Sequence, residues 1–202
     1  MKLYYSPGAC SLSPHIVLLE AALPHTLEKV NLKTKKTAAG GDYLAINSKG
    51  SVPVLELDDG KILTEGPAVV QYLADQKPES GLAPRAGTFE RYQLMEILNY
   101  ITTEVHKNFT PLFNPEASEE LKSAARTAIG KKFDWLTAFL AGKTFLIGNA
   151  FSVADAYLFT VLNWPAHVGI DLGKWPALAA YHSRIAQRPK VQQALKEEGL
   201  LK

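Results

Sequence analysis

The chain contains a single cysteine, Cys10, among its 202 residues. One thiol cannot form an internal disulfide, and it cannot build a cysteine-based zinc site by itself. We therefore expect no metal site. We also expect a cytoplasmic setting, in which a lone thiol stays reduced and available for chemistry.

Long apolar runs and an excess of one charge are also missing. No stretch approaches the ~20 apolar residues that a membrane-spanning helix needs, and the first ten residues have no apolar core of the kind that signal peptides carry. The 22 basic and 20 acidic residues leave a formal charge of +2, and neither sign forms a long run. These features favour a globular protein with neither a nucleic-acid partner nor a membrane partner.

The first part of the chain alternates strand-like and helical patterns. Residues 2–6, 11–23 and 26–32 indicate a strand, a helix and a strand, which implies a right-handed parallel βαβ unit. Residues 51–65 place Asp59-Gly60 between two alternating apolar runs and so predict a hairpin, and residues 66–76 predict a helix. The order βαβ followed by ββα is that of a thioredoxin-like domain with a mixed sheet.

The second part of the chain reads as helix throughout. Residues 77–87 are rich in Pro, Gly and Ala and have no hydrophobic periodicity, as is typical of a linker. Helices are predicted over 88–109, 118–142 and 152–164, with two shorter ones after Pro176 and Pro189. The predicted domains are a thioredoxin-like domain over 1–78, a linker over 79–87 and an all-α domain over 88–202. Ser152 and Asp155 form a capping-box pattern, and the loss of either is expected to cost ~1 kcal/mol.

Cys10 follows a Pro-Gly turn after the first strand and lies at the start of the first helix. Free cysteines are usually buried structural residues. A helix N-terminus, however, favours a thiolate and lowers a thiol pKa that starts near ~8.5, and open α/β sheets bind ligands at this edge. The pattern Cys10-x-x-Ser13 has no second thiol. It therefore indicates a monothiol that would pair with an external small thiol.

Two further segments carry candidate ligand contacts in the same domain. Pro53 stands at the start of a strand, where base rates favour a trans bond, although this proline is typically cis in thioredoxin-like folds. The backbone of Val52 could then pair with a peptide-like ligand. Glu65 and Gly66 stand where a strand hands over to a helix, which suits a carboxylate ligand, or an ammonium on Glu65; ordinary helix capping is an equal alternative.

The long helix of the second part carries a polar strip beside its apolar seam. Asn99, Thr103 and His106 are spaced by four and three residues and so share one helical face. Glu104 and Lys107 flank that face. A lone histidine here is more often structural, but the three polar residues together favour a strip that faces a groove.

Together these segments resemble a cytosolic-type glutathione S-transferase of the bacterial beta class, over essentially the whole chain. The resemblance rests on "MKLYYSPGACSLSPHI", "NSKGSVPVLELDDG", "LTEGPAVVQYLAD", "LNYITTEVHKNFTPLF" and "FSVADAYLFTVLNW". It implies a homodimeric detoxification enzyme with no tightly bound cofactor and with glutathione as co-substrate. The glutathione-binding residues that the resemblance implies are Cys10, Lys35, Val52, Pro53, Glu65, Gly66, Asn99, Thr103, Glu104, Val105, His106 and Lys107.

The implied catalytic residues are Cys10 and His106, and the implied reaction adds the thiolate of glutathione to small hydrophobic electrophiles. An electrophile site is expected near Tyr5, Phe109, Phe113 and Trp164, although such aromatics are more often core. Cys10 could instead form a mixed disulfide with glutathione and reduce disulfides or peroxides. Tyr5, Ser6 and Ser11 are rivals to Cys10, because other classes of the family use a Tyr or Ser hydroxyl. A non-catalytic binding or regulatory protein of the same fold is the remaining alternative.

Overall fold

A computed structural model describes residues 1–201 and divides them into two compact units. Among these residues, the first unit comprises 1–83 and 188–201, and the second comprises 84–187. The C-terminal segment thus belongs with the first unit, which differs from the predicted all-α domain over 88–202. In the described part of the chain, no helix combines the length and apolar character needed to cross a membrane.

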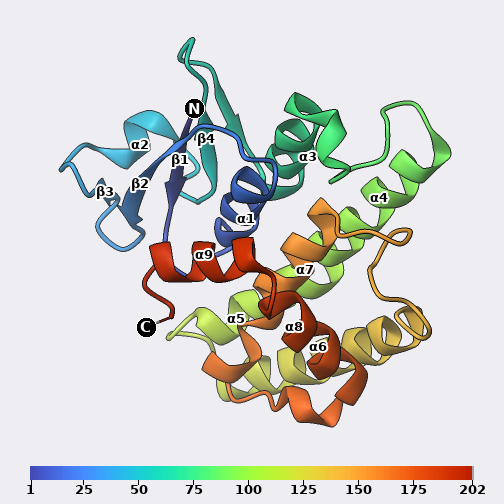
Figure 1. The fold of residues 1–202 in the computed structure, drawn as a ribbon. Coiled ribbons are helices and arrows are strands. Elements are labelled where there is room, and N and C mark those ends of the chain that lie inside the picture. Colours follow the sequence, from blue (N-terminus) through green and yellow to red (C-terminus); the bar gives the residue numbers. More distant parts are fainter. Residues whose placement is uncertain (202) are drawn as a thin grey trace. The chain divides into compact units, whose positions relative to one another are not determined.

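The first unit contains a five-stranded mixed sheet in the order β3-β2-β1-β4-β5 (Figure 1). Its elements are β1 (Lys2–Tyr5), α1 (Leu12–Glu20), β2 (Thr26–Asn31), β3 (Lys36–Thr37), α2 (Tyr43–Ile46), β4 (Val54–Glu56), β5 (Ile62–Thr64), α3 (Gly66–Gln76), a 3₁₀ turn (Pro78–Ser80) and α9 (Pro189–Glu197). The predicted parallel βαβ unit is confirmed by the pairing of β1 with β2. The predicted hairpin is confirmed by the antiparallel pair β4–β5, whereas the short strand β3 was not predicted.

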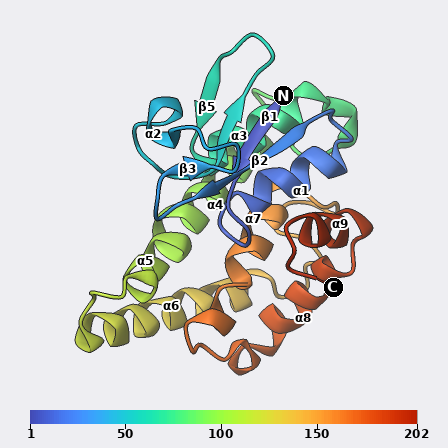
Figure 2. The ribbon, with the colours of Figure 1, turned by 90° about the vertical axis from the view of Figure 1, so that its left-hand side faces the viewer.

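Alternation along the strands separates two cores. Leu3 and Leu55 are paired across β1 and β4 and fully buried. Their neighbours Tyr4 and Val54 point to the opposite face, where they pack in one cluster with Tyr43 of α2. Helices α1 and α3 lie together on the face opposite α2 (Figures 1 and 2).

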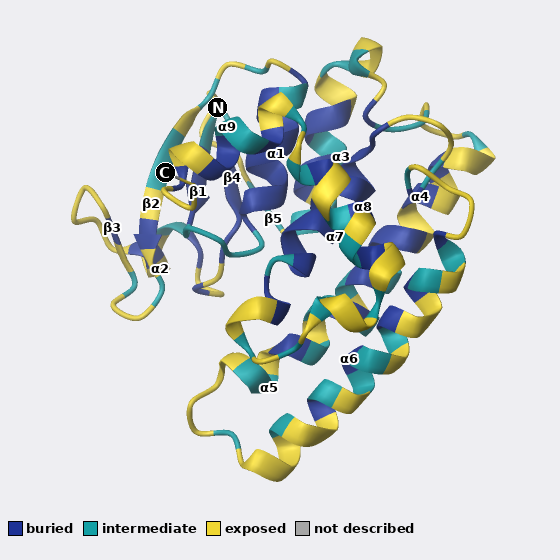
Figure 3. Ribbon diagram, turned by 60° about the horizontal axis from the view of Figure 1, so that its bottom comes forward, coloured by how far each residue is buried: buried dark blue, intermediate teal, exposed yellow. Residues whose placement is uncertain are grey.

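Helix α1 is buried from Leu12 to Leu19. It packs against both α3 and α9, and because its residues are buried on every side its sequence is not amphipathic. Figure 3 shows α1 in the colour of buried residues, while α6 carries exposed residues along its length. The start of α1, which Cys10 precedes by two residues, is therefore held by packing from more than one element.

The second unit is entirely helical, as predicted. Its elements are α4 (Phe89–Tyr100), a π-helical segment (Ile101–Val105), a 3₁₀ turn (His106–Phe109), α5 (Thr110–Phe113), α6 (Glu119–Phe139), α7 (Val153–Leu162), 3₁₀ turns (Pro165–His167 and Leu172–Lys174) and α8 (Pro176–Ala186). The single helix expected over 88–109 is thus broken near its end, where a π-helical turn leads into a 3₁₀ turn. Every residue of α7 is buried, so this helix is the centre of the unit.

The capping box at the start of α7 is confirmed and forms part of a larger network. One oxygen of the buried Asp155 carboxylate accepts from the Ser152 N–H at 2.9 Å and the Ser152 hydroxyl at 2.7 Å. The other accepts from the Leu146 N–H at 2.9 Å and the Tyr181 hydroxyl at 2.7 Å. Burial raises the pKa of Asp155, and these hydrogen bonds oppose that rise. Asp155 therefore joins α7, α8 and the loop before α7.

Asp155→Asn should destabilise the protein by on the order of 3 kcal/mol, because it turns an acceptor into a donor and leaves buried donors unsatisfied. This exceeds the ~1 kcal/mol expected for a cap alone. Ser152→Ala, which deletes one hydroxyl, should cost only about 1 kcal/mol. Urea unfolding followed by circular dichroism measures both. Equal midpoints for wild type and Asp155→Asn would contradict the network.

Candidate active site

Cys10 lies in the turn between β1 and α1, one residue before the N-cap Ser11. Gly8 adopts φ +71°, a conformation that favours glycine. The turn is closed by the Ala9 N–H, which donates to the Ser6 carbonyl at 3.0 Å. The cysteine is thus fixed at the carboxyl end of β1, which is the predicted position.

The Cys10 thiol contacts the segment that leads into β4. Its Sγ donates to the Val52 carbonyl at 3.1 Å, and the Val52–Pro53 peptide bond is cis. Two segments 42 residues apart in sequence therefore meet at the sulfur, as expected for a thioredoxin-like site. Val52 is itself buried and packs in the cluster around Tyr43.

Burial raises the pKa of Cys10 to about 12. The backbone N–H groups of Cys10 and Ser11 oppose this rise, while the charge of Glu65 adds to it. The expectation that the helix N-terminus lowers this pKa is therefore wrong for the unliganded protein, because desolvation outweighs the N–H donors. Cys10 retains partial exposure and is a neutral thiol that donates a hydrogen bond.

Among the rival hydroxyl groups, that of Ser11 has structural partners. The Ser11 hydroxyl is buried, accepts from the Ser6 N–H at 3.1 Å and donates to the Ser6 carbonyl at 3.3 Å. Ser13, the last residue of the C-x-x-S pattern, is buried and donates to the Cys10 carbonyl at 2.9 Å. The ring of Tyr5 packs against His15 at a centroid distance of 6.3 Å. Ser11 and Ser13 thus build the turn, and Cys10 remains the group presented by it.

Glu65 is in an unusual backbone conformation between β5 and α3. Its φ of 69° is rare for a residue with a side chain, and such conformations concentrate at functional sites. The carboxylate pairs with Lys49 Nζ, which also donates to the Thr64 hydroxyl at 2.7 Å. Gly66 is the first residue of α3, where helix N–H groups lack partners within the helix. Lys49 was not among the predicted site residues, although it lies within the quoted segment 47–60.

Lys35 is held against the loop before Val52. Its Nζ donates to the Gly50 carbonyl at 2.7 Å. The next residue, Ser51, accepts from the Tyr43 hydroxyl at 2.7 Å and the Asn47 amide at 2.8 Å. The loop that presents Val52 is therefore fixed by three side-chain donors.

The predicted polar strip of the second unit spans three kinds of helix. Asn99 and Thr103 are exposed, and the Thr103 hydroxyl donates to the Asn99 carbonyl at 3.1 Å. Glu104 pairs with Lys132 at 2.6 Å, and this hydrogen bond lowers the pKa of Glu104. Lys107 is exposed, whereas Val105 is fully buried. Val105 therefore belongs to the core of the unit.

His106 follows the π-helical segment, a feature that often marks functional sites. Its Nδ1 lies 2.6 Å from the Tyr157 hydroxyl, and its ring packs edge-on against Trp164 at 4.7 Å. Burial, and then the charge of Lys107, lowers the pKa of His106 to about 4. The imidazole is therefore neutral near pH 7. Tyr157 was missed because nothing in the spacing from 106 to 157 indicates contact.

Three of the four aromatics expected at an electrophile site form one cluster. Trp164 packs edge-on against Phe109 at 5.4 Å and against Phe113 at 5.7 Å. Phe109 is fully buried, while half of Phe113 is exposed. The fourth aromatic, Tyr5, belongs to the first unit. Only Phe113 thus offers a large exposed aromatic surface in this set.

A thioredoxin-like sheet carrying a cysteine beside a Val-Pro segment, followed by a helical unit, defines the fold class of glutathione S-transferases. The chain matches the family described as glutathione S-transferase, N-terminal domain, over residues 8–76 and the family described as glutathione S-transferase, C-terminal domain, over residues 100–189. The chain belongs to the glutathione S-transferase family. The expected fold, family and class of enzyme are confirmed.

Relatives resemble the chain over its full length. It is 48% identical to glutathione S-transferase GstA of Escherichia coli O157:H7 over 99% of this chain and 100% of that protein. A solved bacterial beta class glutathione S-transferase of Sphingomonas chungbukensis is 53% identical with a TM-score of 0.97, and each chain is covered completely. A sphingomonad glutathione S-transferase solved in complex with glutathione is 52% identical, with a TM-score of 0.96 and complete coverage of both chains.

The low pKa of His106 makes folding stability depend on pH. In the unfolded chain His106 takes up a proton with a pKa of 6.5, whereas in the folded protein it does so only near pH 4. Stability should therefore fall as the pH drops from about 6.5 towards 4, and the difference between these values corresponds to on the order of 3 kcal/mol at most.

His106→Gln removes this contribution and should flatten the pH dependence by that amount, measured by urea unfolding at neutral pH and near pH 4.5. The exposed His167 offers a matched control, and His167→Gln should keep the wild-type slope. If wild type and His106→Gln lose stability in parallel on acidification, the folded imidazole is not held neutral.

Proposed function

We propose that the protein conjugates the thiolate of glutathione to small hydrophobic electrophiles, with Cys10 as a neutral hydrogen-bond donor. The observation that carries the proposal is the contact between Cys10 Sγ and the Val52 carbonyl at 3.1 Å. A peptide-like ligand that pairs with the Val52 backbone as an added strand would bring its own sulfur close to this thiol. The solved complex of a relative with glutathione supports that choice of ligand.

The chemistry follows from which of two thiols keeps the proton. The nucleophile in conjugation must be a thiolate. Because burial raises the pKa of Cys10 to about 12, well above the ~8.5 of an ordinary thiol, Cys10 stays protonated when a second thiol beside it ionises. The Cys10 S–H would then turn from the Val52 carbonyl to the glutathione sulfur and stabilise its charge.

Other residues are assigned roles in binding. Glu65 and the N–H of Gly66 would hold the two charged groups of the γ-glutamyl end. Lys35 would meet the glycyl carboxylate. From the second unit, the resemblance assigns contacts to Asn99, Thr103, Glu104, His106 and Lys107. The proposal also includes a cytoplasmic homodimer and an electrophile site at Phe113 and its aromatic neighbours.

Disulfide or peroxide reduction through Cys10 is the second candidate, favoured by the presence of one partly exposed thiol without a second cysteine. In that reaction the Cys10 thiolate attacks a glutathione mixed disulfide, forms a new S–S bond and expels the other thiol as the leaving thiolate. With a pKa of about 12, Cys10 would be a thiolate in only about one molecule in 100,000 at pH 7. Conjugation is therefore the stronger candidate.

Cys10→Ala and Cys10→Ser separate the two reactions. If Cys10 is a donor, Cys10→Ala should lower the kcat/KM of aryl halide conjugation by about 10–100-fold, the value of a hydrogen bond to a charged group. Cys10→Ser keeps a donor and should retain more of the activity. Both variants should lose any reduction of a glutathione mixed disulfide.

The alternatives give different results in the same assays. Conjugation that survives unchanged in both variants, while disulfide reduction disappears, would make Cys10 a redox residue. Absence of both activities in wild type, together with no glutathione binding by calorimetry, would leave a non-catalytic protein of this fold.

Glu65→Gln should raise the KM for glutathione by about tenfold, through loss of one charge-assisted bond to the ligand ammonium. The kcat should change little, and because the carboxylate is exposed the melting temperature should stay within a few degrees. Glu79, another exposed glutamate of the first unit, provides the control. A Glu79→Gln variant that raises KM as much as Glu65→Gln would show a general charge effect.

A further inference from the structure

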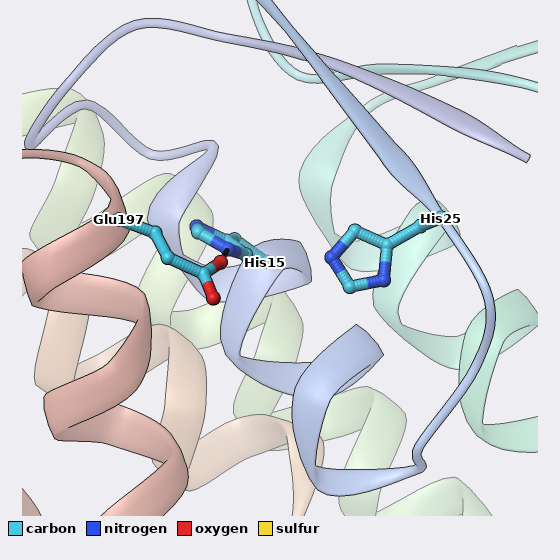
Figure 4. Close-up of side chains that lie close together, drawn as sticks. All are labelled: His15, His25 and Glu197. Carbon is cyan, nitrogen blue, oxygen red and sulfur yellow. Dashed lines mark hydrogen bonds and ion pairs between the residues drawn. The ribbon is translucent and has the colours of Figure 1, made fainter.

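Outside the site described above, two histidines and a glutamate converge within the first unit. His15 comes from α1, His25 precedes β2 and Glu197 ends α9. One ligand atom from each lies within 4.8 Å of the other two. Figure 4 shows the ring nitrogen of His25 that is remote from the backbone pointing towards His15 and Glu197.

Two carboxylates surround the His15 ring, and this surrounding suits a cation. Its Nδ1 lies 3.0 Å from the buried carboxylate of Glu198, and its Nε2 lies 2.8 Å from Oε2 of Glu197. A neutral imidazole has one N–H and can satisfy only one of these carboxylates. With Nδ1 donating to Glu198, Nε2 presents a lone pair beside Oε2 of Glu197, and a bound cation could accept both.

His25 offers a third ligand atom to such a cation. Its Nδ1 lies 2.8 Å from the Leu23 carbonyl, which can only accept, so Nδ1 carries the proton. In the neutral ring Nε2 is the lone-pair nitrogen, and it is the nitrogen that faces the other two residues. A metal ion bound between His15 and Glu197 could accept this third donor.

Each donor atom is also oriented by a neighbour. Glu198 accepts from His15, the Leu23 carbonyl accepts from His25, and the Gln193 amide donates to Oε1 of Glu197 at 2.9 Å and leaves Oε2 facing the cluster. Such supporting hydrogen bonds accompany metal-ligating histidines and carboxylates in known sites. They fix Nε2 of both histidines as the ligand atoms.

We propose that His15, His25 and Glu197 bind a divalent transition-metal ion of the zinc type. Two imidazole nitrogens and one carboxylate oxygen suit Zn²⁺ and its neighbours, whereas Mg²⁺ and Ca²⁺ prefer oxygen alone. Donors of a tetrahedral Zn²⁺ site lie about 3.3 Å apart, so the 2.8 Å pair must open slightly and His25 must approach. Glu197 is exposed and His25 half-buried, which leaves a route from solvent and a fourth position for water.

The ion would lie between His15 and Glu197 and join three segments of the first unit. A dipositive ion also balances the two carboxylates of Glu197 and Glu198. Because α9 returns from the end of the chain to α1, metal binding would fasten this C-terminal helix. This site is separate from the Cys10 thiol, whose hydrogen bond is to Val52.

Cobalt(II) titration of untagged protein, freed of metal by a chelator, tests the proposal. Wild type should bind one equivalent and show the visible bands of a tetrahedral nitrogen–oxygen site without a sulfur charge-transfer band, and zinc should displace the cobalt. His25→Ala and Glu197→Gln should weaken binding by at least about tenfold. Both leave the buried contact of His15 with Glu198 in place, whereas His15→Ala would break it.

Two controls make the result decisive. His167→Ala removes an exposed histidine of the second unit, and Cys10→Ser removes the thiol; both variants should bind cobalt as wild type does. Zinc should raise the melting temperature of wild type but not of His25→Ala. No binding up to millimolar metal, or equal binding by wild type and His25→Ala, would overturn the proposal.

Discussion

The buried carboxylate of Glu198 joins the two ends of the chain, and the position of the Cys10 turn depends on it. One oxygen accepts from the Gly8 N–H at 2.9 Å and the other meets His15 Nδ1 at 3.0 Å. A fully buried carboxylate without such partners would cost several kcal/mol. The turn, the first helix and the C-terminal segment therefore satisfy one another's polar groups.

An ion pair between Arg188 and Glu20 also connects α9 to the thioredoxin-like unit. Arg188 donates two hydrogen bonds, at 2.7 and 2.9 Å, to the Glu20 carboxylate at the end of α1. Figure 2 shows α9 beside α1. The sequence predicts a helix after Pro189, and that helix is confirmed. The apolar positions of α9 indicate that one face is buried, but they do not identify the element that covers this face. The predicted all-α domain over 88–202 therefore included α9 together with the helices that precede it in the sequence.

Features set by local chemistry were predictable, and features set by long-range packing were not. The β4–β5 hairpin, the βαβ unit and the Ser152–Asp155 cap each follow from a few adjacent residues. The π-helical turn at Ile101–Val105 does not, because its residues have ordinary helical spacing and that spacing does not mark the extra residue of the turn. The same holds for Tyr157 beside His106 and Lys132 beside Glu104.

The Cys10 pKa shows how such packing changes a chemical interpretation. Position alone places a thiol at a helix N-terminus, and this argues for a thiolate. Burial reverses that conclusion, because removing a thiolate from water costs more than the N–H groups of Cys10 and Ser11 return. A thiol that holds its proton is a poor nucleophile but a good hydrogen-bond donor. Under the proposed function a second cysteine is not needed, because the sulfur that reacts would be the ligand's and Cys10 would stabilise its charge.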